Sequence, residues 1–347
     1  MVRLFTVFCL VALLCPLTGA SAAQPLRVHA WVDYFPAWLH EEFTRETGIP
    51  IVQSFMAENT SLRTALVEHG ATLHYDIVTP SSEMLQQLAS EGLLLALDRE
   101  QIPNMADIDP WFSGLGYDKG SVYSVPIFWG VLGIVIDKRV IPAEVASRIK
   151  GYKDLWMPEL KDKLLLPNDF RSLMSIMLLS LGYGVNDFER LPQAMQALES
   201  LLPSVAQFDT VDQLDSMLKG NIGVGVVWAR KDYVAKDMEG IFAFIPAKEG
   251  SPVWIDTLAV PAAAGNPKAA FAFINFVLRP DILARLGESS GYAVAGKKAR
   301  ELLPEELRNQ PALYPPDSLR ERFEPELMLP PAADDLMKRW NKLRGNR

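Results

Sequence analysis

Between residues 26 and 91 the chain alternates short apolar segments with longer amphipathic ones, and this alternation limits the possible folds more than any other feature. The helices are followed by Gly48 and Gly92, which are typical end signals. A strand-helix repeat of this kind predicts a parallel-type sheet with helices outside it, that is, an α/β fold. The pattern predicts strands over 26–31, 50–55 and 75–79 and helices over 36–47, 59–69 and 82–91.

A second unit of the same class is predicted further along the chain. The apolar stretch 121–136, which contains Trp129, Gly130 and Gly133, is expected to lead into it, and the segment 251–261 is expected to cross back. The length of 347 residues and an apolar content of 49% suit two domains with a core each. We predict one lobe from residues 24–134 plus 257–300 and a second from 135–256 plus 301–347. Within these ranges we expect strands over 164–166 and 224–228 and helices over 171–181, 191–202, 267–286 and 334–344.

The N-terminus has the three parts of a secretory signal peptide, which we assign to residues 1–23. Arg3 precedes the apolar run 4–14, and small residues over 18–23 form the expected cleavage site. The apolar run is too short to span a bilayer, and no later stretch is both long and free of charge. Cys9 and Cys15 both lie in the leader, and Leu14 stands where a lipoprotein needs a small residue. A mature chain without cysteine fits a soluble protein of the bacterial periplasm.

The charge of the chain limits its partners. The formal net charge is −8, and removal of Arg3 with the leader makes it −9. An acidic protein of this kind lacks the positive surface that holds nucleic acid or anionic lipid. The charge favours a cationic small molecule instead.

One hydrolase motif occurs, but its context is wrong for catalysis. The segment Gly287-Glu-Ser-Ser-Gly291 matches G-x-S-x-G, a motif that needs a strand before it and a histidine after it. Every histidine lies far upstream, and we interpret Gly291 as the C-cap of a helix. The four are His29, His40, His69 and His74.

Cofactor and metal motifs are equally weak. Gly223 and Gly225 lack the third glycine of a dinucleotide-binding fingerprint, so we interpret their segment as a buried strand. We find no P-loop, and no His or Cys pair has metal-ligand spacing on one face. The sequence therefore predicts no enzyme, no cofactor and no metal site.

The segment SPVWIDTLAVP, residues 251–261, carries a possible ligand site. Strand alternation places Trp254 and Asp256 on the same face of an otherwise apolar strand. An unpaired carboxylate there costs several kcal/mol unless a partner arrives, and a ligand ammonium beside an indole would be such a partner. The alternative is that Asp256 caps a turn or pairs with an internal arginine while Trp254 packs in a core.

Several further segments, in this order and spacing, resemble the polyamine-binding proteins of bacterial ABC importers, of the spermidine and putrescine receptor type. The likeness covers nearly all of the mature chain, although no single segment is specific. The segments are Ala30-Trp-Val-Asp-Tyr34, Asp76-Ile-Val-Thr-Pro-Ser81, Ile127-Phe-Trp-Gly130, Leu164-Leu-Leu-Pro-Asn-Asp169, Val226-Val-Trp228, Trp254-Ile-Asp256, Gly291-Tyr292 and Leu313-Tyr-Pro315.

The resemblance implies a two-lobed periplasmic binding protein, type II-like, in which each lobe is a mixed sheet flanked by helices. Such a receptor closes like a hinge on a linear polyamine in the cleft between the lobes and passes it to a membrane permease. It implies a monomer as well. Aromatic faces between carboxylates suit ammonium groups on methylene spacers, because each cation-π contact contributes roughly 0.5 to 2 kcal/mol. The ligand-binding candidates are Trp31, Asp33, Tyr34, Ser81, Glu83, Asp169, Trp228, Trp254, Asp256 and Tyr292.

Some candidates have structural alternatives. Ser81 and Asp169 are natural helix N-caps, and alternation can turn Asp33 away from its neighbours. Glu83 stands where the family usually has an aromatic residue, and it is either a cleft acid or a favourable charge at a helix start.

Other departures from the family pattern bear on the ligand. Val32 replaces a frequent hydroxyl and Ser172 a second-lobe acid, while Arg230 and Lys231 directly follow Trp228. A tail acid, Glu324 or Glu326, stands near a polar position of the family. These departures leave open a receptor of the same fold for another amine. A polyamine-loaded sensor that docks on a membrane signalling protein is a second alternative, because only the outer faces of the lobes distinguish it from a transport receptor.

Overall fold

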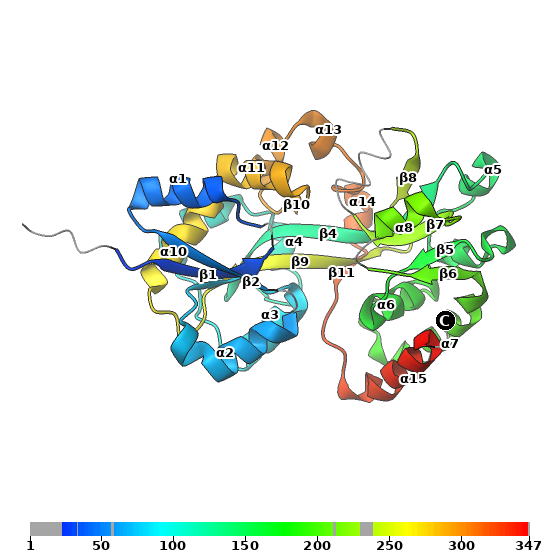
Figure 1. The fold of residues 1–347 in the computed structure, drawn as a ribbon, viewed down its shortest axis with the longest axis horizontal. Helices are drawn as coiled ribbons and strands as arrows, with labels where there is room; N and C mark the ends of the chain where they lie inside the picture. The colour runs from blue at the N-terminus through cyan, green and yellow to red at the C-terminus, as the bar shows by residue number, and fades with distance from the viewer. Residues whose placement is uncertain (1–22, 33, 57–58, 211–212, 230–238, 346–347) are drawn as a thin grey trace, which may run out of the picture.

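The computed structural model describes residues 23–32, 34–56, 59–210, 213–229 and 239–345. Of the predicted signal peptide only Ala23 is among them. Figure 1 shows two lobes of strands covered by helices, joined by long strands that run from one lobe into the other. Within the described residues, none of the helices combines the length and the apolar character needed to cross a membrane.

The first lobe begins with the predicted strand-helix repeat. The central strand β1 pairs in parallel with β2 and β3, while α1 lies on one side of this sheet and α2 and α3 lie on the other (Figure 1). Gly48 ends α1 with a φ of 73°, a conformation that glycine adopts without strain. The elements are β1 (Leu26–Trp31), α1 (Ala37–Thr47), β2 (Ile51–Met56), α2 (Asn59–Leu73), β3 (Ile77–Val78) and α3 (Ser82–Ser90).

Two antiparallel strands, β4 (Ser124–Asp137) and β9 (Ser251–Ala259), connect the lobes. All 14 residues of β4 are buried, which explains why the sequence there is a continuous apolar run. The first half of β4 pairs with β9, and its second half pairs with β7 (Val224–Trp228) and β8 (Phe242–Ile245). The predicted crossing segments are confirmed.

The second lobe is a mixed sheet with helices around it. Strand β5 pairs in parallel with β6 and β7, and β7 pairs antiparallel with β4. The C-terminal helix α15 (Asp334–Gly345) packs on this lobe through Trp340, which is 2% exposed. The further elements of the lobe are α5 (Ala143–Ala146), β5 (Leu164–Leu166), α6 (Phe170–Ser180), α7 (Leu191–Leu201), β6 (Val205–Phe208) and α8 (Gln213–Lys219).

The helix predicted over 267–286 is wrong as a single element. The chain forms α10 (Pro267–Val277) and α11 (Pro280–Ser290), because Pro280 lacks an N–H and starts a new helix. Gly291 ends α11 with a φ of 76°, so the predicted C-cap is confirmed. The remaining elements are α4 (Pro110–Ser113), β10 (Ala293–Val294), α12 (Lys297–Leu302), α13 (Glu305–Arg308), α14 (Asp317–Arg320) and β11 (Phe323–Pro325), with 3-10 turns at 99–101, 103–107, 152–156, 158–160, 188–190, 202–204 and 331–333.

Strand β4 contributes side chains to two large hydrophobic cores, and the boundary between the cores lies between Val131 and Leu132. The first core also contains Val253, Ile255 and side chains of the segment 303–323, whereas the predicted lobes assign these to the second unit. Judged by these cores, the chain therefore passes from the second lobe to the first near residue 250 and returns to the second lobe beyond residue 323. The residue limits predicted for the two lobes as rigid units that move against each other stay a prediction.

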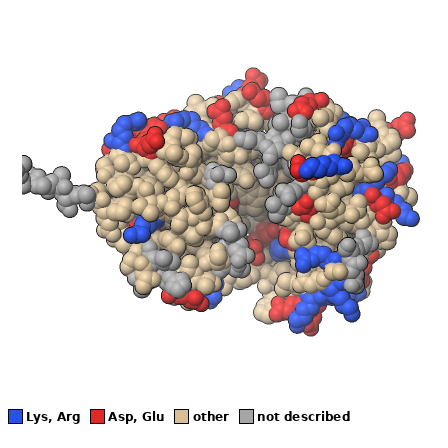
Figure 2. Space-filling view, in the orientation of Figure 1, with Lys and Arg blue, Asp and Glu red and all other residues tan. Residues whose placement is uncertain are grey.

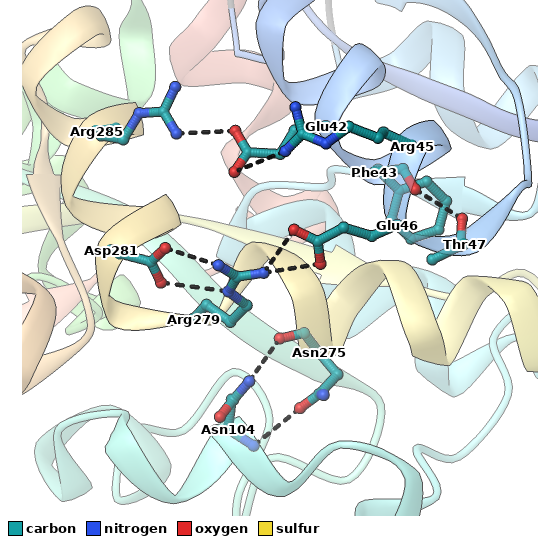
Figure 3. Close-up of polar contacts among 10 residues, drawn as sticks. All are labelled: Glu42, Phe43, Arg45, Glu46, Thr47, Asn104, Asn275, Arg279, Asp281 and Arg285. Carbon is teal, nitrogen blue, oxygen red and sulfur yellow. Dashed lines mark hydrogen bonds and ion pairs between the residues drawn. The ribbon is translucent and has the colours of Figure 1, made fainter.

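Ion pairs attach α1 to α11 on the outside of the first lobe (Figure 3). Arg279 binds Glu46 and Asp281 at 2.9 and 2.8 Å, and Arg285 binds Glu42 at 2.9 Å. Tyr34 lies before α1 and Tyr292 lies after α11, and the centroids of their rings are 6.0 Å apart.

Candidate ligand-binding cleft

The surface is hollowed between the two lobes, where the connecting strands pass (Figure 2). Acidic side chains lie along the lower edge of this hollow in the view of Figure 2. Apart from Asp33, which lies outside the described residues, the predicted ligand-binding residues come from both lobes.

Asp256 is the buried carboxylate of the cleft. It lies on β9 opposite Phe128 of β4, bridges the backbone of Ser81, and is only 7% exposed. Tyr34 donates its hydroxyl hydrogen to Asp256 Oδ2. Burial raises the pKa of Asp256 to about 7, although Tyr34 and the Trp31 indole both lower it. Among the described residues, the buried Nε1 of Trp31 has no hydrogen-bond partner.

Four aromatic rings pack against one another near this carboxylate, three of the ring pairs edge to face and the pair Phe128–Tyr292 tilted. Tyr34 lies 5.1 Å from Phe128 and 6.0 Å from Tyr292, measured between ring centroids. Tyr292 lies 5.1 Å from Trp254 and 5.9 Å from Phe128. Trp254 therefore stands on the same side of β9 as Asp256, as strand alternation predicts. An aromatic enclosure around one carboxylate is a suitable environment for an ammonium group.

The position of the Trp254 indole depends on Gly130. The two residues pair across β4 and β9, and a Cβ built on Gly130 would lie 2.6 Å from Trp254 Nε1. Any side chain at position 130 would push the indole out of its place. The glycine is therefore required by close packing, since its φ is not in the left-handed region.

Trp228 lies on β7, the strand on the other side of β4 from β9. It pairs with Leu132, two residues beyond Gly130, so the two tryptophans belong to the two strands that flank β4 near the point where the cores divide. Trp228 is half-buried and packs against the core of the second lobe.

A second group of acidic residues comes from elements of both lobes. Glu83 starts α3 of the first lobe, Asp169 caps α6 of the second lobe, and Glu326 follows β11. Burial raises the pKa of all three carboxyl groups, most clearly for Glu326, to about 7. Arg171 lowers each of these pKa values, while Asp169 raises those of Glu83 and Glu326. The carboxyl groups of Glu83 and Asp169, which belong to different lobes, therefore interact electrostatically.

The structure shows which of the candidate residues act as helix caps. Asp169 does cap α6, since its Oδ1 accepts from Ser172 N at 2.7 Å, and the same carboxyl group belongs to the acidic group. The Ser81 side chain does not cap α3, and its backbone bridges Asp256. Ser172 is buried at 2% exposure. Asp33, Arg230 and Lys231 lie outside the described residues.

Sequence reasoning missed Phe128, Gly130, Arg171 and the choice between the tail acids. Phe128 and Gly130 lie in a fully apolar strand, where nothing marks the face toward the cleft. Glu324 reaches Asn186 Nδ2 at 3.4 Å, whereas Glu326 joins the acidic group. A signal was present for Arg171, because an arginine in an otherwise apolar helix needs a structural reason.

The hydrolase-like motif lies inside α11 and its C-cap, with no strand leading into it. Its Ser289 side chain donates to the backbone oxygen of Leu286. The glycine pair at 223 and 225 leads into the buried strand β7, as predicted. Neither segment has the geometry that its motif requires.

Two lobes joined by crossing strands, with a buried carboxylate among aromatic rings between them, define a two-lobed solute-binding protein. A family model described as bacterial extracellular solute-binding protein matches residues 38–315, and the chain belongs to this family. It is a binding protein of the extracellular or periplasmic type and not an enzyme.

The chain is 34% identical to the spermidine/putrescine-binding periplasmic protein of Salmonella typhimurium over 300 residues, which cover 85% of this chain and 84% of the relative. It is 27% identical to a putrescine-binding periplasmic protein of Escherichia coli over 357 residues, covering 95% and 94%. Among solved structures, the spermidine/putrescine ABC transporter substrate-binding protein of Streptococcus pneumoniae matches with a TM-score of 0.84 and 28% identity, covering 93% of this chain and 100% of that one. The expected receptor class is confirmed.

Proposed function

We propose that this chain captures a linear polyamine of the spermidine and putrescine class and delivers it to an ABC permease. The observation that carries this proposal is Asp256, a carboxylate buried beside Tyr34, Trp254 and Tyr292. A buried carboxylate with a raised pKa lacks a compensating cation, and a ligand ammonium would supply it. The names of the relatives support the same ligand class.

Binding is proposed to close the cleft. Asp256 and Glu83 are held by the first lobe, whereas Asp169 is held by α6 of the second lobe. Ammonium groups that contact both sides would therefore bind the closed form more tightly than the open form and shift the population toward it.

The test is calorimetric titration of the mature, ligand-stripped protein with putrescine, spermidine, norspermidine and spermine. Glutamate and glycine betaine serve as control ligands. We expect at least one polyamine to bind with micromolar or tighter affinity and Asp256→Ala to abolish that binding. Absence of binding to all four polyamines by folded protein would refute the proposed ligand, and wild-type affinity in Asp256→Ala would refute the proposed site.

The cellular setting forms part of the proposal. We place the mature protein in the periplasm as a monomer, after cleavage of the leader near Ala23 or Gln24. Capture of a permease by the ligand-loaded protein would support transport, whereas capture of the periplasmic domain of a membrane sensor would replace delivery by signalling.

A further inference from the structure

A second aromatic cluster of the first lobe encloses a cation of the chain itself. The guanidinium carbon of Arg320, at the end of α14, lies 4.8 Å from the centroid of the Trp111 ring and 5.9 Å from that of Trp129. Arg320 also binds Asp109 at 2.9 Å, and neither of these two side chains is more than 25% exposed. Aromatic rings beside one carboxylate are suitable surroundings for an organic cation. The cluster therefore resembles the proposed ligand site in its chemistry, with Arg320 as its occupant.

Ring contacts contribute much of what holds this guanidinium. In the part of the chain that the structure describes, the buried Nε of Arg320 has no hydrogen-bond partner. Its second ion pair, to the exposed Asp317, is 3.5 Å long. A planar guanidinium stacks on aromatic faces, whereas a lysine ammonium is a compact point charge. The site is therefore shaped for an arginine and not for a cation of any kind.

The cluster lies on the face of β4 opposite the ligand site. Trp129 directly follows Phe128, and strand alternation turns the two rings to opposite faces. The Trp129 ring lies 5.6 Å from Trp111 and 6.2 Å from Tyr314, measured between ring centroids. The Phe128 ring lies 5.9 Å from Tyr292. Arg320 is thus separated from the ligand site by the strand itself.

The same cluster holds β10, the strand that follows Tyr292. Strand β10 pairs with β4 at Trp129. Trp129 Nε1 donates to the Val294 oxygen at 3.4 Å, and Val294 N donates to the Tyr314 hydroxyl oxygen at 3.0 Å. Because Tyr292 precedes Val294 by two residues, a shift of Trp129 would also shift this ring of the ligand site.

We propose that Arg320 is a positioning residue for ligand binding, which fills a guanidinium site behind β4 and thereby holds Trp129, β10 and Tyr292 in place. The inference rests on the polyamine-binding function proposed above, but it concerns a residue that does not touch the ligand. Removal of Arg320 leaves the aromatic site without its cation and loosens the wall of the cleft. An arginine that only stabilised the fold would leave the affinity of the folded protein unchanged.

The first experiment measures the affinity of folded Arg320→Ala for spermidine by calorimetry. We expect the affinity to fall at least about tenfold, because small displacements of positioned groups have effects of this size. The control is Arg285→Ala, which removes an arginine that also lies over a tryptophan, Trp38, and binds an acid, Glu42, on the outside of the same lobe. The control should bind spermidine within about threefold of the wild type.

Guanidinium chloride, at concentrations far below those that unfold the protein, then tests the site itself. A free guanidinium ion matches the vacated site in shape and charge. We expect it to raise the spermidine affinity of Arg320→Ala at least about threefold relative to wild-type protein in the same solution, whereas an equal concentration of sodium chloride should not. Comparison with wild-type protein in the same solution corrects for competition by guanidinium in the cleft.

Hydrogen exchange of the ligand-free protein provides a measurement that needs no polyamine. The amide hydrogens of residues 293–295 should exchange at least about threefold faster in Arg320→Ala than in the wild type, because β10 opens locally when Trp129 is less firmly held. Arg285→Ala should exchange like the wild type over these residues.

Wild-type affinity in folded Arg320→Ala would overturn the inference, and so would a loss of affinity without rescue by guanidinium or unchanged exchange over residues 293–295. Failure of wild-type protein to bind any polyamine would refute the proposed function instead, and the exchange measurement would still decide whether Arg320 positions β10. If Arg320→Ala does not fold, Asp109→Asn removes the ion pair but keeps an acceptor for Trp111 N. Unchanged affinity and exchange in that variant would overturn the inference equally.

Discussion

Replacing Asp256 with asparagine should stabilise the ligand-free protein, and the gain should grow with pH. Asparagine has nearly the same shape, and its amide oxygen can still accept the Tyr34 hydrogen bond. The pKa of Asp256 is raised from 3.8 to about 7 by burial, so the folded chain favours the protonated form. The carboxyl group therefore favours folding most at pH below 3.8, and this contribution is lost as pH rises through about 7.

The magnitude follows from the size of the pKa shift. A shift of about three units corresponds to about 4 kcal/mol at about 1.36 kcal/mol per unit, which is the cost of the buried carboxylate above pH 7. At pH 5 only about 1.6 kcal/mol of that cost applies. The reason is that pH 5 is only about 1.2 pH units above 3.8, the pKa of this carboxyl group in the unfolded chain. Asp256→Asn should thus gain about 2.5 kcal/mol more stability at pH 8 than at pH 5.

The assay is urea denaturation of wild-type and Asp256→Asn protein, both free of ligand, at pH 5 and pH 8. The other titrating groups, including Glu326, affect both proteins and cancel in the difference. A stability difference that is equal at the two pH values would refute the argument that Asp256 is held in a costly ionised form. Loss of polyamine binding in the same variant would show that the cost serves function.

Three further perturbations have defined outcomes. Putrescine affinity should rise with pH by up to about tenfold per unit between pH 5 and 7, because the ligand binds ionised Asp256; calorimetry in buffers of different ionisation enthalpy should detect proton release, and equal affinity at pH 5 and 7 would contradict this. Gly130→Ala should weaken polyamine binding at least about tenfold and shift tryptophan fluorescence by displacing the Trp254 indole, whereas the control Gly116→Ala, where a Cβ meets nothing within 4 Å, should bind like the wild type. Arg279→Ala should lower the unfolding free energy by no more than about 1 kcal/mol, since its ion pairs to Glu46 and Asp281 are partly exposed, and a larger loss in urea denaturation would mean that the contact between α1 and α11 is stronger than such pairs usually are.

Local periodicity predicted most elements of this fold. Strand β1 has its expected bounds of 26–31, α1 ends at Gly48, and Gly92 with a φ of 70° follows the C-cap Glu91 of α3. The break within 267–286 has a local cause as well, because Pro280 ends one helix and starts the next although the apolar pattern continues through it.

The relation between Trp254 and Asp256 was also available from the sequence, since it depends only on the two-residue period of a strand. The hydrogen bond between Tyr34 and Asp256 was not, because 222 residues separate them and no periodicity extends over that distance. The resemblance to a family suggested both residues without giving their contact.

By itself the sequence determined an acidic, two-lobed α/β binding protein with a carboxylate and an indole on one strand. Only the tertiary structure decided that Glu326, and not Glu324, joins Glu83 and Asp169, and that Arg171 is engaged with neutral acceptors. The physical reason is that hydrophobic patterns and end signals act over a few residues, whereas the field at a cleft is the sum of charges brought together by packing of distant segments.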